Sequence, residues 1–474
     1  MGESGDSGLL ECLAAIVGTR HVLFNPVEIS PYLTDYRGRY TGNALAVAKP
    51  GNTEEVAALV KYCAGRGIPM VPQGGNTSLC GGATPLPDGK SIVISLSRLN
   101  RVRALDKENA TICVEAGCIL DNVNERAQTD AGLIFPLYLA SGGSCDIGGV
   151  LSTNAGGMNV MRYGNMRDLT LGLETVLPDG RIWNGLRGLR KDNTGYDLKQ
   201  LFIGAEGTLG IITAAVLKLF PSSRSEATAW ANVPSPAAAI ALLARFRDRC
   251  GDRVHLFELV GRPLLELVLR HIPASRAPLN KLSEWSVLVD LRDVADDVPL
   301  ADLLEQTLNT AIEAGEANDA AIAASRAQAK DFHALRESAN EAQKIEGFSI
   351  KHDISVPVSR IPEFISRANA ALHAWQPAVR IVAFGHVGDG NIHYNLFPPN
   401  GMDETAFAAC AEEARRIVHD IVFELEGSIS AEHGLGQLKR EAIRRYKNAV
   451  ELDLMRTIKH ALDPQGLMNP GKVL

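Results

Sequence analysis

Three glycine-rich segments in the first half of the chain constrain its fold more than any other feature. They span residues 72–82, 142–157 and 204–210. Glycine adopts backbone angles that a residue with a Cβ resists, so one such segment alone is explained by tight turns. Three of them together favour another interpretation, because successive backbone N–H groups in tight turns form concave sites suited to a pyrophosphate.

None of these segments matches a common nucleotide-binding loop. The first does not read Gly-x-Gly-x-x-Gly and no suitably placed acidic residue follows it, so it is not a Rossmann fingerprint. It also lacks the Gly-Lys-Ser/Thr ending of a mononucleotide-binding loop. We therefore expect a different dinucleotide-binding fold.

Length and composition describe an acidic globular protein with more than one domain. The 474 residues are too many for one compact core, and 48 basic against 55 acidic residues leave a net charge of −7 that argues against nucleic acid as a partner. Residues 1–8 lack the basic flank and the apolar stretch of a secretory signal, so none is expected, and no apolar run is long enough to span a bilayer. No two of the 8 cysteines have Cys-x-x-Cys spacing, so we expect reduced thiols. These features fit a cytoplasmic enzyme of bacterial type, with an organelle matrix as the alternative.

The spacing of apolar residues predicts an α+β lobe that ends near Pro221. A helix is expected over 53–66, capped by Thr53 and ended by Gly67. A strand at 68–71 leads into the first glycine-rich segment. Further strands are expected at 91–96, 110–115, 169–177 and 208–219.

A second lobe is expected between about 225 and 380, where the pattern changes. Long alanine-rich helices, such as 300–330, alternate there with strands such as 285–291. The last hundred residues return to glycine-punctuated motifs and end in a rigid tail at 463–472. Such a tail is expected to pack against the rest of the chain.

A second informative block runs over residues 384–395, where an apolar stretch meets Asp389-Gly390 and a second alternating stretch begins. This pattern predicts a β-hairpin. Across it His386 and His393 can lie opposite each other, and Asn395 shares the face of His393 because side chains alternate along a strand. Such a pair is either two locally hydrogen-bonded histidines or half of a metal site.

A third block at residues 430–436 contains Glu432 beside His433. Two imidazoles and one carboxylate form the usual ligand set of a catalytic zinc, which leaves open positions for a substrate. Spacing alone leaves both interpretations open, a metal site and a purely structural one.

Taken in order, the glycine-rich motifs resemble the FAD-binding domain of the vanillyl-alcohol oxidase superfamily, of the p-cresol methylhydroxylase (PCMH) type. Within it the chain resembles the D-2-hydroxyglutarate dehydrogenase and D-lactate dehydrogenase branch, and the stretch 189–204 is especially like the first. The resemblance runs from about residue 30 to the C-terminus. Its motifs are Gln73-Gly74-Gly75-Asn76-Thr77, Gly143-Ser144-Cys145, Ile147-Gly148-Gly149, Thr153-Asn154-Ala155-Gly156-Gly157, Arg162-Tyr163-Gly164 and Gly204-Ala205-Glu206-Gly207-Thr208-Leu209-Gly210.

The resemblance implies an α+β fold with a PCMH-type FAD-binding domain at 1–222 and a second α+β substrate or cap domain at 223–425. A short helical C-terminal segment at 426–474 is expected to pack back on the FAD domain. FAD binding is expected to be non-covalent, because no histidine lies in 72–82 or 141–157. The residues implied to bind FAD are Gln73, Gly74, Gly75, Asn76, Thr77, Leu79, Gly81, Gly82, Gly143, Ser144, Cys145, Ile147, Gly148, Gly149, Thr153, Asn154, Gly156, Gly157, Tyr163, Gly164, Glu206, Gly207, Gly210, Ile211, Ile212 and Asn469.

The resemblance also implies a metal site with a catalytic base. His386, His393 and Glu432 match ligands of a divalent metal, with zinc as the first candidate, and His433 matches the catalytic base. A metal that holds the substrate's 2-hydroxyl acidifies it, and an imidazole can take the proton near neutral pH. Hydride then passes to the flavin and the product is a 2-oxo acid. Asn395 matches a position near the substrate.

A dicarboxylate substrate needs a second anion site, and Arg336 and Lys351 match the family's cationic residues for the distal carboxylate. A buried guanidinium pairs well with a carboxylate and would discriminate against lactate. The alternative is a surface ion pair of Arg336 with Glu337 or Glu341. Asn340 stands where close relatives have threonine and is counted among the substrate-binding residues.

The leading hypothesis is a FAD- and metal-dependent dehydrogenase that oxidises D-2-hydroxyglutarate to 2-oxoglutarate. Its electrons would go to an electron-transfer flavoprotein or a quinone. The alternatives are a D-lactate, D-malate or glycolate dehydrogenase or an oxidase of the same fold, and a non-catalytic subunit that keeps the flavin fold. The Glu432-His433 pair and the hairpin histidines argue against the last of these. A homodimer is the default expectation.

Overall fold

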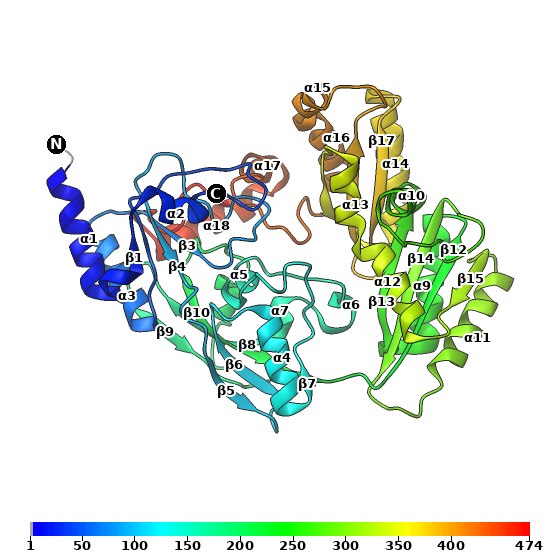
Figure 1. The fold of residues 1–474 in the computed structure, drawn as a ribbon, viewed down its shortest axis with the longest axis horizontal. Helices are drawn as coiled ribbons and strands as arrows, with labels where there is room; N and C mark the ends of the chain where they lie inside the picture. Colours follow the sequence, from blue (N-terminus) through cyan, green and yellow to red (C-terminus); the bar gives the residue numbers. More distant parts are fainter. Residues whose placement is uncertain (1–2) are drawn as a thin grey trace. The chain divides into compact units, whose positions relative to one another are not determined.

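The computed structural model describes residues 3–474 and divides into two compact units (Figure 1). Unit 1 comprises the chain up to Gly157, Tyr163–Ser222 and Glu432–Leu474, and unit 2 comprises Met158–Arg162 and Ser223–Ala431. The chain therefore leaves unit 1 after Ser222 and returns to it at Glu432. Unit 1 contains more than one sheet, and unit 2 is built on a single large sheet with its own core.

The first sheet of unit 1 has the strand order β1-β2-β4-β3. β2 and β3 both run parallel to β4, while β1 is antiparallel to β2. Helix α3, Thr53–Ala64, connects β2 to β3, and its buried face packs with helix α1, Glu3–Val17, against the sheet. The strands are β1 Val22–Leu23, β2 Ala46–Ala48, β3 Met70–Gln73 and β4 Ile92–Ser95.

Helix α3 confirms the predicted helix, but its cap is not the predicted one. The side chain of Asn52 accepts a hydrogen bond from the backbone N–H of Glu55 at 2.8 Å and so caps the helix. The hydroxyl of Thr53 instead donates to the buried Glu174 at 2.6 Å. Thr53 therefore connects α3 to the second sheet through its hydroxyl and does not cap the helix.

The second sheet of unit 1 is antiparallel throughout, with the order β5-β6-β10-β8-β9. The predicted strands of this lobe are confirmed, because each corresponds to one strand of the first or second sheet. A buried core packs one side of the sheet against three helices, α4 (Leu120–Ala131), α5 (Ile147–Ser152) and α7 (Met166–Leu169). The strands are β5 Val102–Asp106, β6 Thr111–Glu115, β8 Thr170–Val176, β9 Ile182–Gly185 and β10 Ile211–Lys218.

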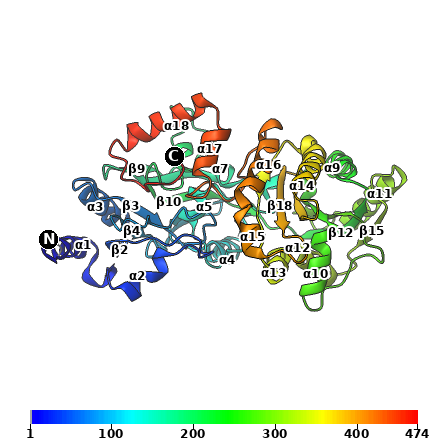
Figure 2. The same cartoon turned by 90° about the horizontal axis from the view of Figure 1, so that it is seen from above.

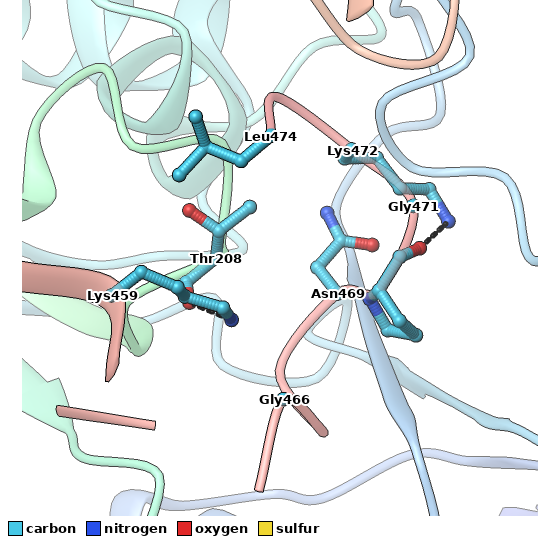
Figure 3. Close-up of a pocket in the computed structure, with 8 residues that line it drawn as sticks. Thr208, Lys459, Gly466, Asn469, Gly471, Lys472 and Leu474 are labelled. Carbon is cyan, nitrogen blue, oxygen red and sulfur yellow. Dashed lines mark hydrogen bonds between the residues drawn. The ribbon is translucent and has the colours of Figure 1, made fainter. Parts of the chain in front are cut away.

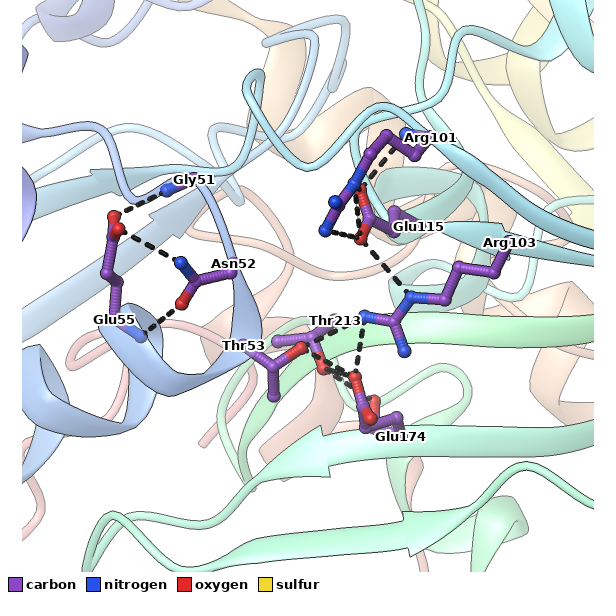
Figure 4. A network of polar contacts seen from close by, with 9 residues as sticks. All are labelled: Gly51, Asn52, Thr53, Glu55, Arg101, Arg103, Glu115, Glu174 and Thr213. Carbon is purple, nitrogen blue, oxygen red and sulfur yellow. Dashed lines mark hydrogen bonds and ion pairs between the residues drawn. The ribbon is translucent and has the colours of Figure 1, made fainter.

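A buried ion network connects α3 to the second sheet (Figure 4). Arg103 on β5 lies 3.2 Å from the carboxylate of Glu115 and 3.0 Å from that of Glu174. Glu174 also accepts hydrogen bonds from the hydroxyls of Thr53 and Thr213. Buried carboxylates are stable only with such partners, so this network fixes the two sheets of unit 1 relative to each other.

The remaining elements of unit 1 include two C-terminal helices, α17 and α18, that lie beside its sheets in both views (Figures 1 and 2). Lys459 on α18 donates to the carbonyl oxygens of Thr208 and Met468, which attaches this helix to a glycine-rich segment. These elements are η1 Thr19–His21, α2 Pro26–Leu33, α4 Leu120–Ala131, β7 Leu133–Ile134, α5 Ile147–Ser152, α7 Met166–Leu169, α8 Lys199–Phe202, β11 Phe220–Pro221, α17 Arg440–Tyr446 and α18 Ala449–Leu462. The short helix α6, Val160–Tyr163, begins in the stretch Met158–Arg162 of unit 2.

Unit 2 is built on one seven-stranded sheet, and every adjacent pair of strands in it is antiparallel. The strand order is β15-β12-β14-β13-β17-β18-β16, so strands distant in the sequence pair at the centre. The strands are β12 Ser225–Val233, β13 Val254–Gly261, β14 Trp285–Asp293, β15 Asp319–Ile322, β16 Asp353–Ser355, β17 Arg380–His386 and β18 Asn391–Phe397.

Helices cover both faces of this sheet, and Figure 2 shows the sheet between the two sets. On one face α10, α12 and α13 pack against Trp230, Leu288 and Phe384. On the other face α9 and α14 bring Phe246 against Phe257 and Phe364 against Tyr394. The helices are α9 Pro236–Cys250, η2 Gly251–Arg253, α10 Arg262–His271, α11 Leu300–Glu313, α12 Arg326–Glu337, α13 Ala339–Glu346, η3 Val358–Arg360, α14 Ile361–Trp375, α15 Glu404–Ala409 and α16 Ala411–Glu424.

The prediction of one long helix over 300–330 is wrong. The helix α11 ends at Glu313, before Gly315 with its positive φ of 75°, and strand β15 follows at Asp319–Ile322. β15 pairs with β12 at the edge of the sheet, and this pairing overrides the helix propensity of its alanines. Strand β14 confirms the predicted strand at 285–291.

No helix in the part of the chain that the structure describes has the length and apolar character needed to cross a membrane.

Candidate active site

The polar side chains of interest in unit 2 share one face of its sheet. Glu258 lies opposite His386 where β13 pairs with β17, and Phe384 lies opposite His393 where β17 pairs with β18. Asp353 lies opposite His393 on the other side, where β16 pairs with β18. Because side chains alternate along a strand and opposite residues project to the same side, these five share the face covered by α10, α12 and α13.

The predicted hairpin is confirmed, but its two histidines are not opposite each other. The register pairs His393 with Phe384, so His386 and His393 are diagonal neighbours with ring centroids 6.0 Å apart. The turn occupies residues 387–390 and is centred between Gly388 and Asp389, one residue before the Asp-Gly pair that was expected to form its centre. This shift moves the pairing of the strands by two residues.

Glu258 is a fully buried acid at the centre of this face. Its Oε1 lies 3.0 Å from His386 Nε2, and its Oε2 lies 2.7 Å from Arg336 Nε. Burial by itself would raise the pKa of Glu258, but the charges of Arg336 and His386 outweigh it and lower the pKa to about 2. The side chain is therefore an ionised acceptor that holds two donors.

The two residues predicted to bind the distal carboxylate, Arg336 and Lys351, and the predicted substrate-binding residue Asn340 differ in their positions. Arg336, in the last turn of α12, is buried over the ring of Phe384, with 4.7 Å from its guanidinium carbon to the ring centroid. It pairs with Glu258, so the alternative of a surface ion pair is wrong. Lys351 is half-buried beside β16, and Asn340 lies on α13 with an exposed side chain.

Three side chains with metal-ligating atoms come together around His393. Asp353, His393 and Glu432 each offer one ligand atom, and these atoms all lie within 4.8 Å of one another. Glu432 directly follows Ala431, whose backbone N–H donates to the Asp353 carbonyl oxygen at 3.2 Å. Two carboxylates and an imidazole are a donor set that suits a divalent cation such as zinc.

The predicted ligand set of His386, His393 and Glu432 is therefore only partly brought together. Asp353 occupies the place in the cluster that was expected for His386, whose Nε2 faces Glu258 and whose Nδ1 lies 3.6 Å from Asp389. Asp353 also accepts a hydrogen bond from Asn391 Nδ2 at 3.0 Å, which fixes its carboxylate.

Two further predicted residues have clear surroundings. Asn395 is buried, accepts from the backbone N–H of His352 at 3.3 Å and donates to Gln343 at 2.8 Å. Its amide therefore connects β18 to the edge of the sheet and to α13. His433 follows Glu432 as the second residue of the returning chain and is half-buried.

In unit 1 the three glycine-rich segments meet. A Cβ added at Gly75 would lie 2.0 Å from the carbonyl oxygen of Ser144, and one at Gly74 would lie 2.1 Å from the carboxylate of Asp146. A Cβ at Gly207 would lie 2.6 Å from the ring of Pro72. These positions require glycine because atoms of another segment approach closely, and they bring the predicted FAD-binding segments into one region.

Several of the predicted FAD-binding side chains hold this region together. Gln73 donates to the carbonyl oxygens of Tyr32 and Ala83, and Asn76 donates to that of Thr34. Gln73 and Asn76 therefore use their side-chain donors to hold the first glycine-rich segment in place. The predicted residues Cys145, Ile147, Ile211 and Ile212 pack in the hydrophobic cores.

The returning chain is fastened to the same region by Glu206. Its carboxylate accepts hydrogen bonds from the backbone N–H groups of Leu435 at 2.7 Å and Gly436 at 2.8 Å. Asn469 adds two more links, because its Nδ2 donates to the carbonyl oxygens of Gly82 and Glu206.

A cavity of about 140 Å³ lies beside this junction (Figure 3). It is lined by Thr208, Lys459, Asn469 and Lys472, among others. Asn469 Oδ1 is a buried acceptor without a hydrogen-bond donor among the described residues. The cavity is too small for a whole dinucleotide, which needs several hundred Å³, but this acceptor suits a ligand with an N–H group.

Sequence reasoning missed Glu258 and Asp353. Glu258 had one usable signal, since it is a charge in the middle of the apolar stretch 254–261, where a buried strand rarely keeps an unpaired acid. Asp353 had none, because nothing local distinguishes it from an acid at the end of an exposed strand.

Known family models match both parts of the chain. The model of FAD linked oxidases, C-terminal domain, matches residues 222–473, and the model of an FAD binding domain matches residues 44–185. The chain is 36% identical over 448 residues to a D-2-hydroxyglutarate dehydrogenase of Xanthomonas citri pv. viticola, with 94% of this chain and 93% of the relative covered. It is also 36% identical over 468 residues to the mitochondrial D-2-hydroxyglutarate dehydrogenase of Bos taurus, with 98% and 83% covered.

The fold is similar to that of solved flavoenzymes. A structure of p-cresol methylhydroxylase with substrate bound superposes with a TM-score of 0.75 at 16% identity and covers 99% of this chain and 97% of the other. The predicted α+β fold with a PCMH-type FAD-binding domain is thereby confirmed.

Proposed function

Because the chain belongs to the FAD-linked oxidase family and is an FAD-dependent D-2-hydroxyacid dehydrogenase, we propose that it oxidises D-2-hydroxyglutarate to 2-oxoglutarate. The observation that carries this proposal is the buried guanidinium of Arg336 on the polar face of the unit 2 sheet. A hydroxy acid with a second carboxylate can pair with it, whereas lactate and glycolate cannot. The proposed electron acceptor is an electron-transfer flavoprotein or a quinone.

Unit 1 supplies the proposed FAD site. The backbone N–H groups of the segments 72–82 and 142–157 would hold the pyrophosphate, and Asn469 Oδ1 would accept a hydrogen bond from the cofactor. When bound, FAD accepts the hydride released from the substrate. Non-covalent attachment is supported by Cys145, because burial raises the pKa of its thiol to about 11 and leaves almost no thiolate to react.

We propose that a divalent metal is held by His393, Asp353 and Glu432, with His386 as the further ligand predicted from the sequence. When bound, such an ion acidifies a coordinated hydroxyl as it acidifies water. Zinc suits this mixture of imidazole and carboxylate donors.

His433 is proposed as the base that removes the proton from the 2-hydroxyl. A neutral imidazole can take up a proton near pH 7, and His433 adjoins the proposed ligand Glu432 in the chain. Lys351 adds a second positive charge for the distal carboxylate. Asn395 is proposed to support this face through its bonds to His352 and Gln343, which keep β18 against the strand that carries Asp353.

A substrate comparison tests the function. The purified FAD-containing protein, assayed with an artificial dye acceptor, is expected to show its highest kcat/KM with D-2-hydroxyglutarate, compared with D-malate, D-lactate and glycolate. In Arg336→Lys the charge beside Glu258 is kept but the forked donor is lost, so kcat/KM for hydroxyglutarate should fall about tenfold to a hundredfold. The value for lactate should change far less.

The matched control is Arg326→Lys at the start of the same helix, where the side chain is 86% exposed and pairs with Glu226. This variant should keep wild-type kinetics for every acid. An equal loss for hydroxyglutarate and lactate in Arg336→Lys would contradict the role of Arg336, and a wild-type preference for lactate would contradict the proposed substrate.

A further inference from the structure

Glu258 connects two residues that come from different elements and have different proposed tasks. His386 ends strand β17, while Arg336 lies in the last turn of α12, above the sheet. Each contacts one oxygen of the Glu258 carboxylate, His386 through Nε2 at 3.0 Å and Arg336 through Nε at 2.7 Å. A buried carboxylate is tolerated only when its partners have good geometry, so the three side chains constrain one another.

The contact determines how His386 can act. An ionised carboxylate only accepts hydrogen bonds, so Nε2 of the imidazole must carry a proton where it meets Glu258. Nε2 then cannot bind a metal, and Nδ1 is the ring atom left for that purpose. A carboxylate behind a ligating histidine fixes its tautomer and its orientation in just this manner.

The same contact determines how Arg336 can act. Glu258 uses the Nε edge of the guanidinium, and the ring of Phe384 lies 4.7 Å from its central carbon. With Nε engaged and one face covered, the terminal nitrogens are the donors that can meet a second anion. The guanidinium is planar and rigid, so fixing Nε fixes the direction of these donors.

We propose that Glu258 is a positioning residue that couples the alcohol end of the substrate site to the distal-carboxylate end. It holds His386 at one end and Arg336 at the other, so displacement of either partner is transmitted to the other. This inference rests on the proposed function and adds to it a determinant of substrate selectivity. Glu258 itself touches no reacting atom in this arrangement.

The experiment compares Glu258→Gln with the wild-type holoenzyme. Glutamine has one acceptor oxygen, and its amide N–H₂ group would face one of the two donors, so one partner is released. With saturating Zn²⁺, KM for D-2-hydroxyglutarate should rise about tenfold or more, while KM for D-lactate stays within about twofold. Zn²⁺ affinity, measured by competition with a chromogenic chelator, should fall about tenfold. Binding of 2-oxoglutarate, followed by the flavin absorbance change, should weaken in parallel with KM.

A double-mutant cycle separates coupling from general damage. If Glu258 acts through Arg336, the double variant E258Q/R336K should bind 2-oxoglutarate no more than about threefold worse than the weaker single variant. Glu226→Gln, an acid on the same sheet in an exposed pair with Arg326, is the matched control and should behave as wild type. If E258Q does not fold, E258D replaces it, because the shorter acid keeps the charge but reaches only one partner.

Two results would overturn the inference. One is an equal loss for hydroxyglutarate and lactate with unchanged Zn²⁺ affinity, and the other is full additivity in the cycle. Failure of the proposed function would look different, since the wild-type enzyme itself would then show no preference for the dicarboxylate.

Discussion

Asp353 illustrates how a single residue changes the proposed chemistry. It lies opposite His393 in the sheet, its Oδ1 is 3.7 Å from His393 Nδ1, and Asn391 fixes its carboxylate. If it binds the metal, Asp353→Asn replaces a charged ligand by a neutral one of the same shape. Affinity for Zn²⁺ should then fall by at least about a hundredfold, because even partners behind a ligand are worth ten- to a hundredfold.

The measurement is the metal content of the purified variant together with turnover and flavin content. Treating the wild-type enzyme with a chelator should abolish turnover while FAD stays bound, and added Zn²⁺ should restore it. The control Asp319→Asn, an exposed acid on β15 of the same sheet, should retain full metal content. Wild-type metal content in Asp353→Asn would contradict the role of Asp353 as a ligand and would favour the ligand set predicted from the sequence, with His386 in its place.

At the level of single residues, the sequence predicted chemistry that depends on local motifs. The glycine-rich segments and the Glu432-His433 pair were recognisable because their neighbours in the sequence carry the signal. Glu258 and Asp353 reach the site through pairing between strands that are more than 30 residues apart along the chain. The charge of Glu258 stands out in its apolar stretch, but no local pattern shows which residues it meets. The cap of α3 was predicted wrongly for a related reason, since the hydroxyl of Thr53 donates a hydrogen bond to Glu174 in a distant strand.

At the level of elements, strands with alternating or continuous apolar residues were predicted well, because a half-buried or buried strand has a distinct period. The prediction of one helix over 300–330 was wrong, because alanine favours a helix but Asp319–Ile322 pairs with β12 as an edge strand of the sheet. The predicted pairing of His386 with His393 was wrong by two residues. The turn is centred one residue earlier than the Asp-Gly pair, so His393 lies opposite Phe384. In both cases the pairing between strands, and not the local preference of the residues, determined the secondary structure or the register.

The joint between α3 and the second sheet can be tested by its central cation, Arg103 (Figure 4). Replacing it with methionine leaves Glu115 and Glu174 without their shared partner, and removal of one member of a largely buried pair is costly. Because the Arg103 side chain is still 27% exposed, we discount the cost to about 2 kcal/mol of unfolding free energy. Urea unfolding of the FAD-bound protein, followed by flavin fluorescence, measures it.

Arg101→Met is the matched control, because Arg101 pairs with the same Glu115 but is 67% exposed. Its loss should destabilise the protein much less than the loss of Arg103, because solvent screens an exposed pair. Burial would raise the pKa of Glu174, but its hydrogen bonds from Arg103, Thr53 and Thr213 outweigh it and lower the pKa. The stabilisation is therefore present above the ordinary pKa of glutamate, about 4.3, and is lost as the pH falls through the lowered value. Equal effects of the two substitutions would contradict the network.

At the level of the whole molecule, the chain leaves unit 1 after Ser222 and returns to it at Glu432 with the proposed base among its first residues. Glu206 binds the returning segment, because its carboxylate accepts hydrogen bonds from the backbone N–H groups of Leu435 and Gly436. Sequence resemblance predicted Glu206 as an FAD-binding residue, whereas the contacts of its side chain suit the anchoring of the segment that carries His433. These two roles have different consequences.

Glu206→Gln distinguishes them. The amide keeps one acceptor and turns a donor toward the other N–H group, a loss of roughly 1–3 kcal/mol for a buried site, which corresponds to about a 5- to 150-fold effect on a geometry-dependent step. If Glu206 anchors the segment, kcat per bound FAD should fall by about tenfold or more while the FAD dissociation constant changes less than about threefold. If it serves the cofactor, the variant should lose FAD and regain wild-type kcat when FAD is saturating. The exposed Glu108→Gln in the same unit provides the control for a lost charge, and equilibrium dialysis of FAD beside steady-state kinetics decides between the two roles.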